Sequence, residues 1–309
     1  MSNIVLSGAG GFLASHLIPS LLADGHHVTG VDIVHPADAW RLDVTEIRHH
    51  PNFTYEWGSA GEWRRYPDDA IVIHAAAVTD VRFSSGSPRY TLQRNLGDAA
   101  LLLEECARQQ VAQVIVVSTH SVYGRQDVQP ISEHAELRPS TFYGAVKAAQ
   151  ELLALSYYRE RGLPVTVVRP ALMYGERERS GALVTTFLQK ALREETITLE
   201  GGGLQTRDFN YVGNMVQAVM LLLGAGWACG DVFNVGSGEE ISIRHLALLA
   251  KKIAGREDKH VALADVRARE GEEGRVFLDS SKIMAHGYKP EVGFTEGVER
   301  TSRWVRGRL

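Results

Sequence analysis

The chain has 309 residues, which corresponds to roughly two domains at about 100–200 residues per domain. Hydrophobic residues make up 44% of it and charged residues 23%, as in ordinary globular proteins, so disordered, collagen-like and coiled-coil chains are excluded. The net charge of −4 provides no positive field for a polyanion, which argues against nucleic acid as a partner.

Neither a membrane anchor nor a secretion signal is recognisable in the sequence. The longest apolar stretch, residues 216–226, is too short to cross a bilayer, and residues 1–5 lack the basic start of a signal peptide. Cys106 and Cys229 are too few and too far apart for a disulfide framework or a structural zinc site. We therefore expect a cytoplasmic protein with two core thiols and no membrane partner.

Short apolar segments alternate with amphipathic helical stretches through the first 170 residues. This alternation is typical of an α/β protein of the doubly wound, Rossmann type, in which helices cover both faces of a parallel sheet. The expected strands are residues 3–7, 28–32, 53–57, 71–74, 114–118 and 165–169, and the expected helices are residues 14–24, 94–110 and 142–161.

The pattern becomes less regular after Pro170. In chain order we expect a charged loop at 175–180, a helix at 183–193, a glycine-rich turn at 201–203, a helix at 214–223 and a strand at 232–235. The apolar runs at 216–223 and 232–235 look like additions to the first core. The second half is therefore interpreted as a smaller lobe interleaved with the sheet.

The segment SGAGGFLASHL, residues 7–17, follows the first expected strand and opens the first helix. Gly8, Gly10 and Gly11 permit positive φ and let the backbone approach a pyrophosphate at the helix N-terminus. Asp32 ends the second strand at the spacing expected for a carboxylate that binds adenosine ribose. Because Asp32 would repel a 2′-phosphate and no Arg follows immediately, these signals favour NAD over NADP. Singly, they also fit a tight turn and a helix cap.

Tyr143 and Lys147 stand four residues apart in YGAVK, so they share one face of an expected helix. An ammonium beside a phenol favours the phenolate and would let Tyr143 exchange protons near neutral pH. The preceding strand ends in VVSTHSVYG, which puts the hydroxyls of Ser118, Thr119 and Ser121 at the ligand-binding edge of the sheet. A Tyr-Lys pair at this spacing is also common on helix surfaces.

His120 stands among these hydroxyls, but no carboxylate partner can be identified for it, so it is interpreted as pocket-lining or structural. The remaining His residues, including the adjacent pairs at 26–27 and 49–50, show no metal-ligand spacing. No metal is expected.

Together these segments resemble the extended short-chain dehydrogenase/reductase family, in its NAD-dependent nucleotide-sugar epimerase/dehydratase branch. The resemblance covers nearly the whole chain. It rests on SGAGGFLASHL, Asp32, HAAA at 74–77, RNLGDAALLLEE, STHSVYG, YGAVK, RPALMYG at 169–175, QTRDFNYV at 205–212, FNVGSGEEISI at 233–243, REGEEGRVFLD at 269–279 and EGVERTSRWVR at 296–306. It implies an NAD-binding domain of residues 1–170 with about 208–238, and a substrate-binding lobe of about 171–207 with 239–309.

The resemblance assigns catalysis to Thr119, Tyr143 and Lys147. Thr119 would fix the sugar hydroxyl, Tyr143 would act as the acid/base, and Lys147 would hold the nicotinamide ribose and lower the tyrosine pKa. Tyr143 would then remove a proton from a sugar hydroxyl while the adjoining C–H passes a hydride to NAD⁺. In an epimerase the transient keto sugar turns over and takes the hydride back on its other face.

The resemblance also implies two sets of binding residues. The cofactor set is Gly8, Gly10, Gly11, Phe12, Leu13, Asp32, Ser59, Ala75, Ala76, Ala77, Asn95, Ser118, Tyr143, Lys147 and Arg169. The substrate set is Thr79, Thr119, His120, Ser121, Tyr143, Arg207 and Arg269. Arg207 and Arg269 match the arginines that clasp the nucleotide diphosphate, a task suited to a guanidinium fork.

Three departures from the family pattern bear on function. Dehydratases carry Asp-Glu after the catalytic Thr and decarboxylases a Glu before Val-Tyr-Gly, whereas here His120 and Ser121 occupy these positions, so elimination and decarboxylation are disfavoured. Leu172 replaces the usual phosphate-binding Asn, so the diphosphate is held differently or the substrate is not a standard sugar nucleotide. Ser59 aligns with the adenine-contacting Asp, or Asp43 does if the third strand is instead residues 40–44.

The leading hypothesis is an NAD-dependent epimerase of a nucleotide-activated sugar, acting at C4 through a transient 4-keto intermediate. The alternative is an NAD(P)-dependent dehydrogenase or ketoreductase of a sugar or a hydrophobic alcohol, which Leu172 favours. A non-catalytic nucleotide-sensing protein is the third, and it is disfavoured because Tyr143 and Lys147 are both present. The family implies a homodimer formed through the helices at 94–110 and 142–161.

Overall fold

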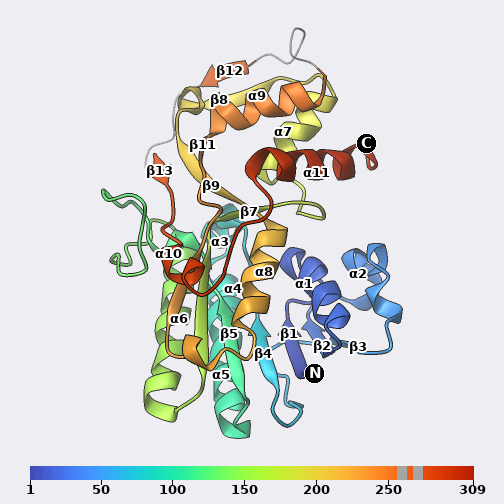
Figure 1. Cartoon of the computed structure of the whole chain (residues 1–309), viewed down its shortest axis with the longest axis vertical. Coiled ribbons are helices and arrows are strands. Elements are labelled where there is room, and N and C mark those ends of the chain that lie inside the picture. The colour runs from blue at the N-terminus through green and yellow to red at the C-terminus, as the bar shows by residue number, and fades with distance from the viewer. Residues whose placement is uncertain (256–262, 267–273) are drawn as a thin grey trace. The chain divides into compact units, whose positions relative to one another are not determined.

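The structure is a computed structural model and describes residues 1–255, 263–266 and 274–309 (Figure 1). It divides into two units. The first unit comprises Met1–Gly124, Glu136–Pro170 and Val216–Phe233, and the second comprises Arg125–Ala135, Ala171–Met215 and Asn234–Leu309.

These units differ from the domains expected from the sequence at residues 125–135, 208–215 and 234–238, which lie in the second unit. One reason is that the Ile131 N–H donates to the Phe277 carbonyl, 2.7 Å away, which ties the 125–135 segment to the chain's C-terminal part. Another is that the strand through residues 206–211 pairs only with strands of the second unit.

Central strands of the seven-stranded sheet, at 71–74 and 113–117, are short runs rich in Val and Ile, as expected of strands buried on both faces. The strand order is β10 (Val232–Val235), β6 (Val165–Pro170), β5 (Gln113–Val117), β4 (Ile71–His74), β1 (Asn3–Ser7), β2 (His27–Asp32) and β3 (Phe53–Trp57). In this order, the neighbouring strands from β6 to β3 pair in parallel. The predicted doubly wound α/β fold is confirmed, with each predicted strand within one residue of its observed bounds.

The helices predicted at 14–24, 94–110 and 142–161 are observed as α1 (Phe12–Ala23), α5 (Asp98–Gln109) and α6 (Phe142–Arg161). The first unit also contains three shorter helices that were not predicted, α2 (Trp40–Val44), α3 (Val81–Gly86) and α4 (Pro88–Leu92). Shorter turns are η1 (Pro36–Asp38), η2 (Ile47–His49), the π-helix η3 (Gln93–Gly97), η4 (His120–Val122) and η6 (Gly226–Ala228). The predicted helix at 94–110 therefore begins as a π-helical turn. The alternative strand at 40–44 is wrong, because this segment is α2.

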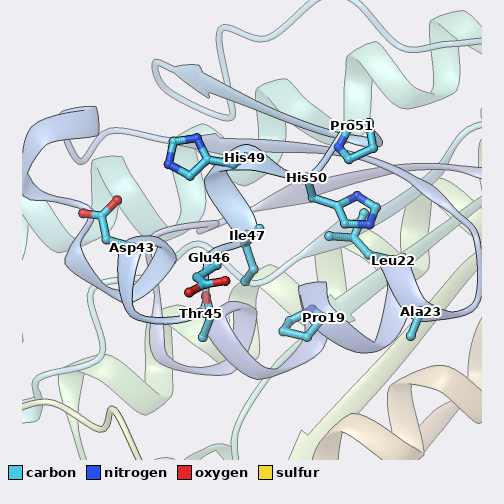
Figure 2. Close-up of a pocket in the computed structure, with 10 residues that line it drawn as sticks. All are labelled: Pro19, Leu22, Ala23, Asp43, Thr45, Glu46, Ile47, His49, His50 and Pro51. Carbon is cyan, nitrogen blue, oxygen red and sulfur yellow. The ribbon is translucent and has the colours of Figure 1, made fainter.

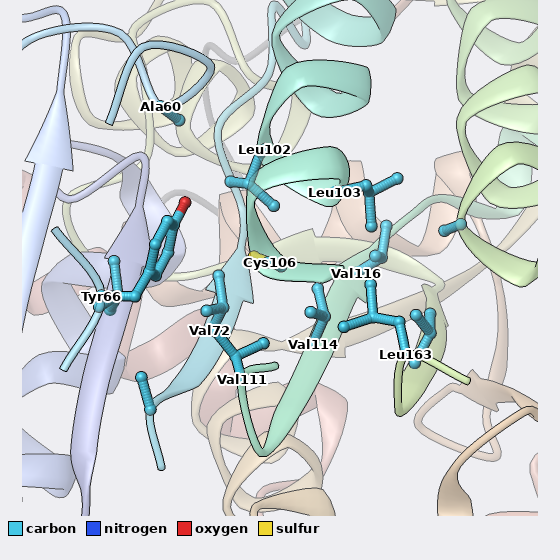
Figure 3. Close-up of a cluster of buried hydrophobic side chains, with 14 of the residues drawn as sticks. Ala60, Tyr66, Val72, Leu102, Leu103, Cys106, Val111, Val114, Val116 and Leu163 are labelled. Atoms are coloured by element: carbon cyan, nitrogen blue, oxygen red, sulfur yellow. The ribbon is translucent and has the colours of Figure 1, made fainter. Parts of the chain in front are cut away.

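One hydrophobic cluster shows how α5 is attached to the sheet (Figure 3). Leu102, Leu103 and Cys106 project from α5 toward Val72 of β4 and Val114 of β5, and these side chains are almost completely buried. Burial of such side chains contributes about 1.5–3 kcal/mol each. The polar residues of the candidate site lie outside this cluster, at the carboxyl ends of the strands.

The second unit contains two small sheets and four helices in its described residues. In the larger sheet, β9 (Thr206–Tyr211) pairs with β7 (Leu172–Tyr174), β11 (Glu240–Ser242) and β13 (Arg275–Val276). In the smaller sheet, β8 (Ile197–Glu200) pairs with β12 (Leu263–Val266). The helices are α7 (Leu183–Leu192), α9 (Ile243–Ile253), α10 (Ser281–Met284) and α11 (Phe294–Arg306), with a turn η5 (Gly201–Gly203). Helix α8 (Val212–Leu222) contains the unit boundary at residue 216.

Candidate active site

The turn between β1 and α1 requires glycine at two positions. Gly8 has φ +79°, and a Cβ there would lie 2.8 Å from the Ala76 nitrogen. Gly11 caps α1, and a Cβ there would lie 2.7 Å from the Gly8 oxygen. The turn is also fastened by the Gly11 N–H, which donates to the Gly8 carbonyl at 2.8 Å. Phe12 and Leu13 then begin α1. This geometry leaves the N-terminus of a 12-residue helix available to an anion, as a dinucleotide pyrophosphate requires.

Asp32, at the end of β2, lies beside this turn. Its two carboxylate oxygens accept hydrogen bonds from the Gly10 and Val34 N–H groups, each at 2.9 Å. Burial raises the pKa of Asp32, and these backbone bonds act in the opposite direction. An acceptor beside the glycine turn fits the ribose hydroxyls of NAD, so the residues present fit this cofactor.

Ala75, Ala76 and Ala77 follow directly after β4, and the backbone of Ala75 and Ala76 lies against Gly8 of the glycine turn. The Ser7 hydroxyl oxygen accepts from the Ala76 N–H at 3.2 Å, and the same hydroxyl is hydrogen-bonded to His74 Nδ1 at 2.7 Å. Ser7 and His74 thus support the backbone beside the glycine turn; neither was singled out from the sequence, although both stand inside quoted motifs. Burial and the positive charge of Lys147 lower the pKa of His74 to about 3.

The turn that follows β4 is held by Asn95. Its side-chain oxygen accepts from the Val78 N–H at 2.7 Å, and its amide donates to the Val78 carbonyl at 3.0 Å. Asn95 is completely buried in the π-helix η3, and Thr79, directly after Val78, is exposed. Asn95 therefore fixes the backbone at Val78, and the neighbouring Thr79 is exposed and so accessible to a ligand.

His74→Asn is expected to flatten the acid limb of the stability curve. The folded pKa of His74 lies below the ordinary value near 6.5, so between pH 6.5 and 3 the unfolded chain binds a proton that the folded chain excludes. Stability is therefore lost as the pH falls through this window, by roughly 2 kcal/mol between pH 7 and 4.5 from this group. Urea unfolding at both pH values measures it, and parallel profiles for the two proteins would contradict the expectation.

The α6 N-terminus carries the Tyr-Lys pair. Thr141 caps the helix by accepting from the Gly144 N–H at 3.1 Å. Tyr143 is buried, which raises its pKa to about 12, whereas a hydrogen bond with the Thr119 hydroxyl acts to lower it. Thr119 itself caps η4 by accepting from the Ser121 N–H at 3.2 Å. The structure therefore joins the hydroxyls of Thr119 and Tyr143.

Lys147 is buried one turn further along α6. Its Nζ donates to the Val117 carbonyl at 2.7 Å and to Gln150. Burial lowers the pKa of Lys147 to about 8, partly offset by the charge of Glu151. In the structure without cofactor, burial outweighs the effects that lower the Tyr143 pKa, and the Lys147 ammonium donates to Val117 and Gln150. The lowering expected when NAD is bound therefore stays a prediction.

Two predicted cofactor residues, Ser118 and Arg169, belong to one buried polar network. The Arg169 guanidinium donates to the Glu151 carboxylate through Nε and Nη2, the latter at 2.6 Å, and its Nη1 donates to the Tyr123 hydroxyl at 2.8 Å. The Ser118 hydroxyl also donates to Glu151. The network joins β5, α6 and β6, and neither Glu151 nor Tyr123 was identified from the sequence.

The remaining predicted residues of the first unit are less enclosed. His120 Nδ1 lies 3.3 Å from the Pro170 carbonyl, and His120 and Ser121 are both half-buried. Ser59 is buried just after β3, and its hydroxyl accepts from the Gly61 N–H at 3.2 Å. Asp43 instead pairs with Arg48 at 2.6 Å in an exposed ion pair, so it does not take the place of Ser59.

The predicted diphosphate residues belong to the second unit. Arg207, on β9, donates to the Thr206 carbonyl at 2.8 Å. Leu172 pairs with Phe209 in the β7–β9 ladder and is half-buried. Arg269 lies outside the described residues.

A surface hollow of the first unit lies apart from these residues (Figure 2). It is lined by ten residues from α1, α2, η2 and their connections: Pro19, Leu22, Ala23, Asp43, Thr45, Glu46, Ile47, His49, His50 and Pro51. Of the residues considered for the site, only the rejected alternative Asp43 is among these ten. Among the described residues, no group of three His, Cys, Asp or Glu side chains could hold a metal ion. Over the same residues, no helix has the length and apolarity needed to cross a membrane.

A Rossmann sheet, a glycine turn with its partner Asp32, and a buried Tyr143 and Lys147 on one helix define a dinucleotide-dependent enzyme. Residues 4–236 match the model of the NAD dependent epimerase/dehydratase family. The chain belongs to this family, which confirms the resemblance stated from the motifs, and its cofactor is NAD.

Individual relatives include two types of enzyme. The chain is 28% identical over 307 residues to a putative UDP-glucose 4-epimerase of Methanocaldococcus jannaschii, with 98% of each chain covered. It is 30% identical over 318 residues to a dTDP-glucose 4,6-dehydratase of an Actinoplanes species, again with 98% of each covered. A UDP-glucuronic acid 4-epimerase of Bacillus cereus, solved with UDP-glucuronic acid and NAD, superposes with a TM-score of 0.89 at 26% identity, covering 99% of this chain and 100% of that one.

Proposed function

We propose that this protein is an NAD-dependent epimerase that inverts C4 of a nucleotide-activated sugar. The site around Thr119, Tyr143 and Lys147 contains the hydroxyl, phenol and ammonium that this chemistry uses. Two of the similar proteins reported above are 4-epimerases of UDP-sugars. We also propose that the first unit holds NAD and the second holds the sugar nucleotide, with Arg207 and Arg269 on its diphosphate.

The proposed mechanism assigns one task to each of these side chains. Tyr143 takes the proton of the C4 hydroxyl and later returns it. The side-chain hydroxyl of Thr119 orients the C4 hydroxyl of the sugar. Lys147 carries a buried ammonium one helical turn away, which in the complex with NAD would hold the nicotinamide ribose and oppose the effect of burial on the Tyr143 pKa. The glycine turn and Asp32 would hold NAD, which would supply a reversible hydride acceptor for C4.

The observation that carries this choice is the pair His120 and Ser121 directly after Thr119. Elimination of water needs a carboxyl acid and base beside the sugar, and neither side chain provides one. The His120 Nδ1 lies toward the Pro170 carbonyl, and the Ser121 N–H donates to the Thr119 hydroxyl oxygen. These two positions after Thr119 therefore offer no carboxyl group for expelling a hydroxyl, whereas Thr119 and Tyr143 can remove and return a hydrogen.

Two assays test the proposal. A thermal-shift panel of UDP-, dTDP-, GDP- and CDP-sugars with NAD identifies the nucleotide, because a ligand that binds the folded state raises the melting temperature. The stabilising sugar nucleotide is then incubated with the enzyme and followed by NMR and by absorbance of NADH. We expect the C4 epimer without net NADH, whereas a deoxy-keto product would overturn the proposal.

Leu172 supports a second candidate, a net dehydrogenase or ketoreductase of a sugar or hydrophobic alcohol. Its side chain cannot hydrogen-bond a phosphate, and it is half-buried on β7. A change of NADH absorbance stoichiometric with the substrate, together with no thermal shift for any sugar nucleotide, would support this function instead.

We further propose that the enzyme is a cytoplasmic homodimer. Cys106 and Cys229 are both free, as suits a reducing compartment. Leu101 on α5 and Leu152 on α6 are 49% and 58% exposed, and two contacting helices with exposed leucines suit a helical dimer interface.

Leu152→Glu is expected to shift the protein from dimer to monomer, because the change puts a charge into the proposed interface. Size-exclusion chromatography with light scattering at several concentrations measures the mass. Leu204→Glu, at a 75% exposed leucine of the second unit, is the matched control and should remain dimeric. A wild-type monomer at all concentrations, or a dimeric Leu152→Glu variant, would refute this interface.

A further inference from the structure

An arginine lies beside the residue that selects the dinucleotide. Arg41, on α2, donates from Nη1 to the Gly10 carbonyl at 3.3 Å, and the Gly10 N–H is bound to Asp32. The positive charge of Arg41 also acts on the Asp32 carboxyl. Arg41 lies nine positions after Asp32 in the chain, and α2 returns the guanidinium to the glycine turn.

The guanidinium of Arg41 is held by more than this one bond. It stacks over the Trp40 ring at 4.6 Å from the centroid, and its residue is half-buried. Such stacking limits the conformations of a long side chain, so less freedom is lost when the guanidinium binds a ligand. Arg41 is therefore a preorganised cation next to the acceptor for the ribose hydroxyls.

In Rossmann sites an acidic residue here binds the free ribose of NAD, whereas a nearby Arg accommodates the 2′-phosphate of NADP. This site contains both. We propose that Arg41 is placed to bind a 2′-phosphate, and that the charge of Asp32 prevents this binding and so excludes NADP. This inference rests on the dinucleotide site and not on the identity of the sugar.

The charges explain how one residue could decide the outcome. A 2′-phosphate carries about −1.5 to −2 charge near neutral pH and three acceptor oxygens. Beside the Asp32 carboxylate it meets repulsion at short range, and the Gly10 and Val34 N–H groups are already used. Replacing Asp32 by the similarly shaped Asn removes the charge repulsion and leaves Arg41 able to form charge-assisted bonds, although the amide can accept from only one of the Gly10 and Val34 N–H groups.

The test measures dinucleotide affinity without any sugar. Asp32→Asn, Asp32→Asn with Arg41→Leu, and Asp32→Asn with Arg48→Leu are titrated with NADPH and NADH by fluorescence, and with 2′,5′-ADP as a competitor. Arg48 is the matched control, because it belongs to the same segment but binds Asp43 and the Pro36 carbonyl. Melting temperatures check folding, and Asp32→Ser replaces Asp32→Asn if that variant does not fold.

We expect Asp32→Asn to bind NADPH at least about tenfold more tightly than the wild type, the scale of one charge-assisted hydrogen bond. Adding Arg41→Leu should abolish that gain, and adding Arg48→Leu should retain it. A folded Asp32→Asn or Asp32→Ser without the gain, or a gain that survives Arg41→Leu, would overturn the proposal. Because no sugar is present, failure of the epimerase assignment would leave this result unchanged.

Discussion

Tyr143→Phe is expected to reduce turnover by about 10²–10⁴-fold, the usual contribution of a positioned acid or base. The change removes one oxygen, which contacts the Thr119 hydroxyl and which accepts the sugar proton in the proposed mechanism. NAD affinity should remain within a few-fold of the wild type, because the glycine turn and Asp32 are untouched. Turnover is measured by NMR of the sugar nucleotide, and NAD binding by fluorescence.

Tyr157→Phe is the matched control for this prediction. Tyr157 lies on the same helix, α6, and its hydroxyl donates to Glu104 at 2.7 Å on the surface. This variant should keep nearly full activity. A Tyr143→Phe enzyme with turnover close to that of the wild type would refute the role assigned to the phenol.

Glu151→Ala is expected to lower the free energy of unfolding by about 3–5 kcal/mol. The change leaves the Arg169 guanidinium buried without its carboxylate, and both side chains are almost completely inaccessible to water. It also removes the acceptor of the Ser118 hydroxyl. Urea unfolding followed by circular dichroism measures the loss.

Two further variants separate the buried charge from simple loss of volume. Glu151→Leu combined with Arg169→Met removes both charges and should recover much of the stability lost by Glu151→Ala. Glu296→Ala breaks an exposed ion pair with Arg300 on α11 and should cost only about 0.3–0.5 kcal/mol. If Glu151→Ala were no more harmful than Glu296→Ala, the network would not have the structural role given to it.

The strands of the sheet could be predicted from the sequence because they are short apolar runs between turn residues, and such runs are recognisable without the structure. It was less informative at residues 93–97, where the π-helical turn accompanies the burial of Asn95 against Val78. It also left open a strand at 40–44, which is α2, because five residues carry too little periodicity to separate strand from helix.

The candidate site was predicted where its residues are close in sequence. Tyr143 and Lys147 share a helix face, and Gly8 and Gly11 share one turn, so spacing alone brings them together. Contacts between distant segments left no such signal. Glu151 with Arg169, His74 with Ser7, and Arg41 with Gly10 depend on how strands and helices are arranged, so they became visible only in the structure.

The most direct test of the proposed epimerisation follows a deuterium atom placed at C4 of the sugar nucleotide. If the hydrogen removed from C4 is returned to the same carbon, both epimers will carry deuterium at C4 and the pool of free NADH will remain unlabelled. NMR of the equilibrated mixture reads both positions. Deuterium on another carbon of the sugar, or stoichiometric transfer of deuterium to NADH, would contradict the assignment of C4 epimerisation.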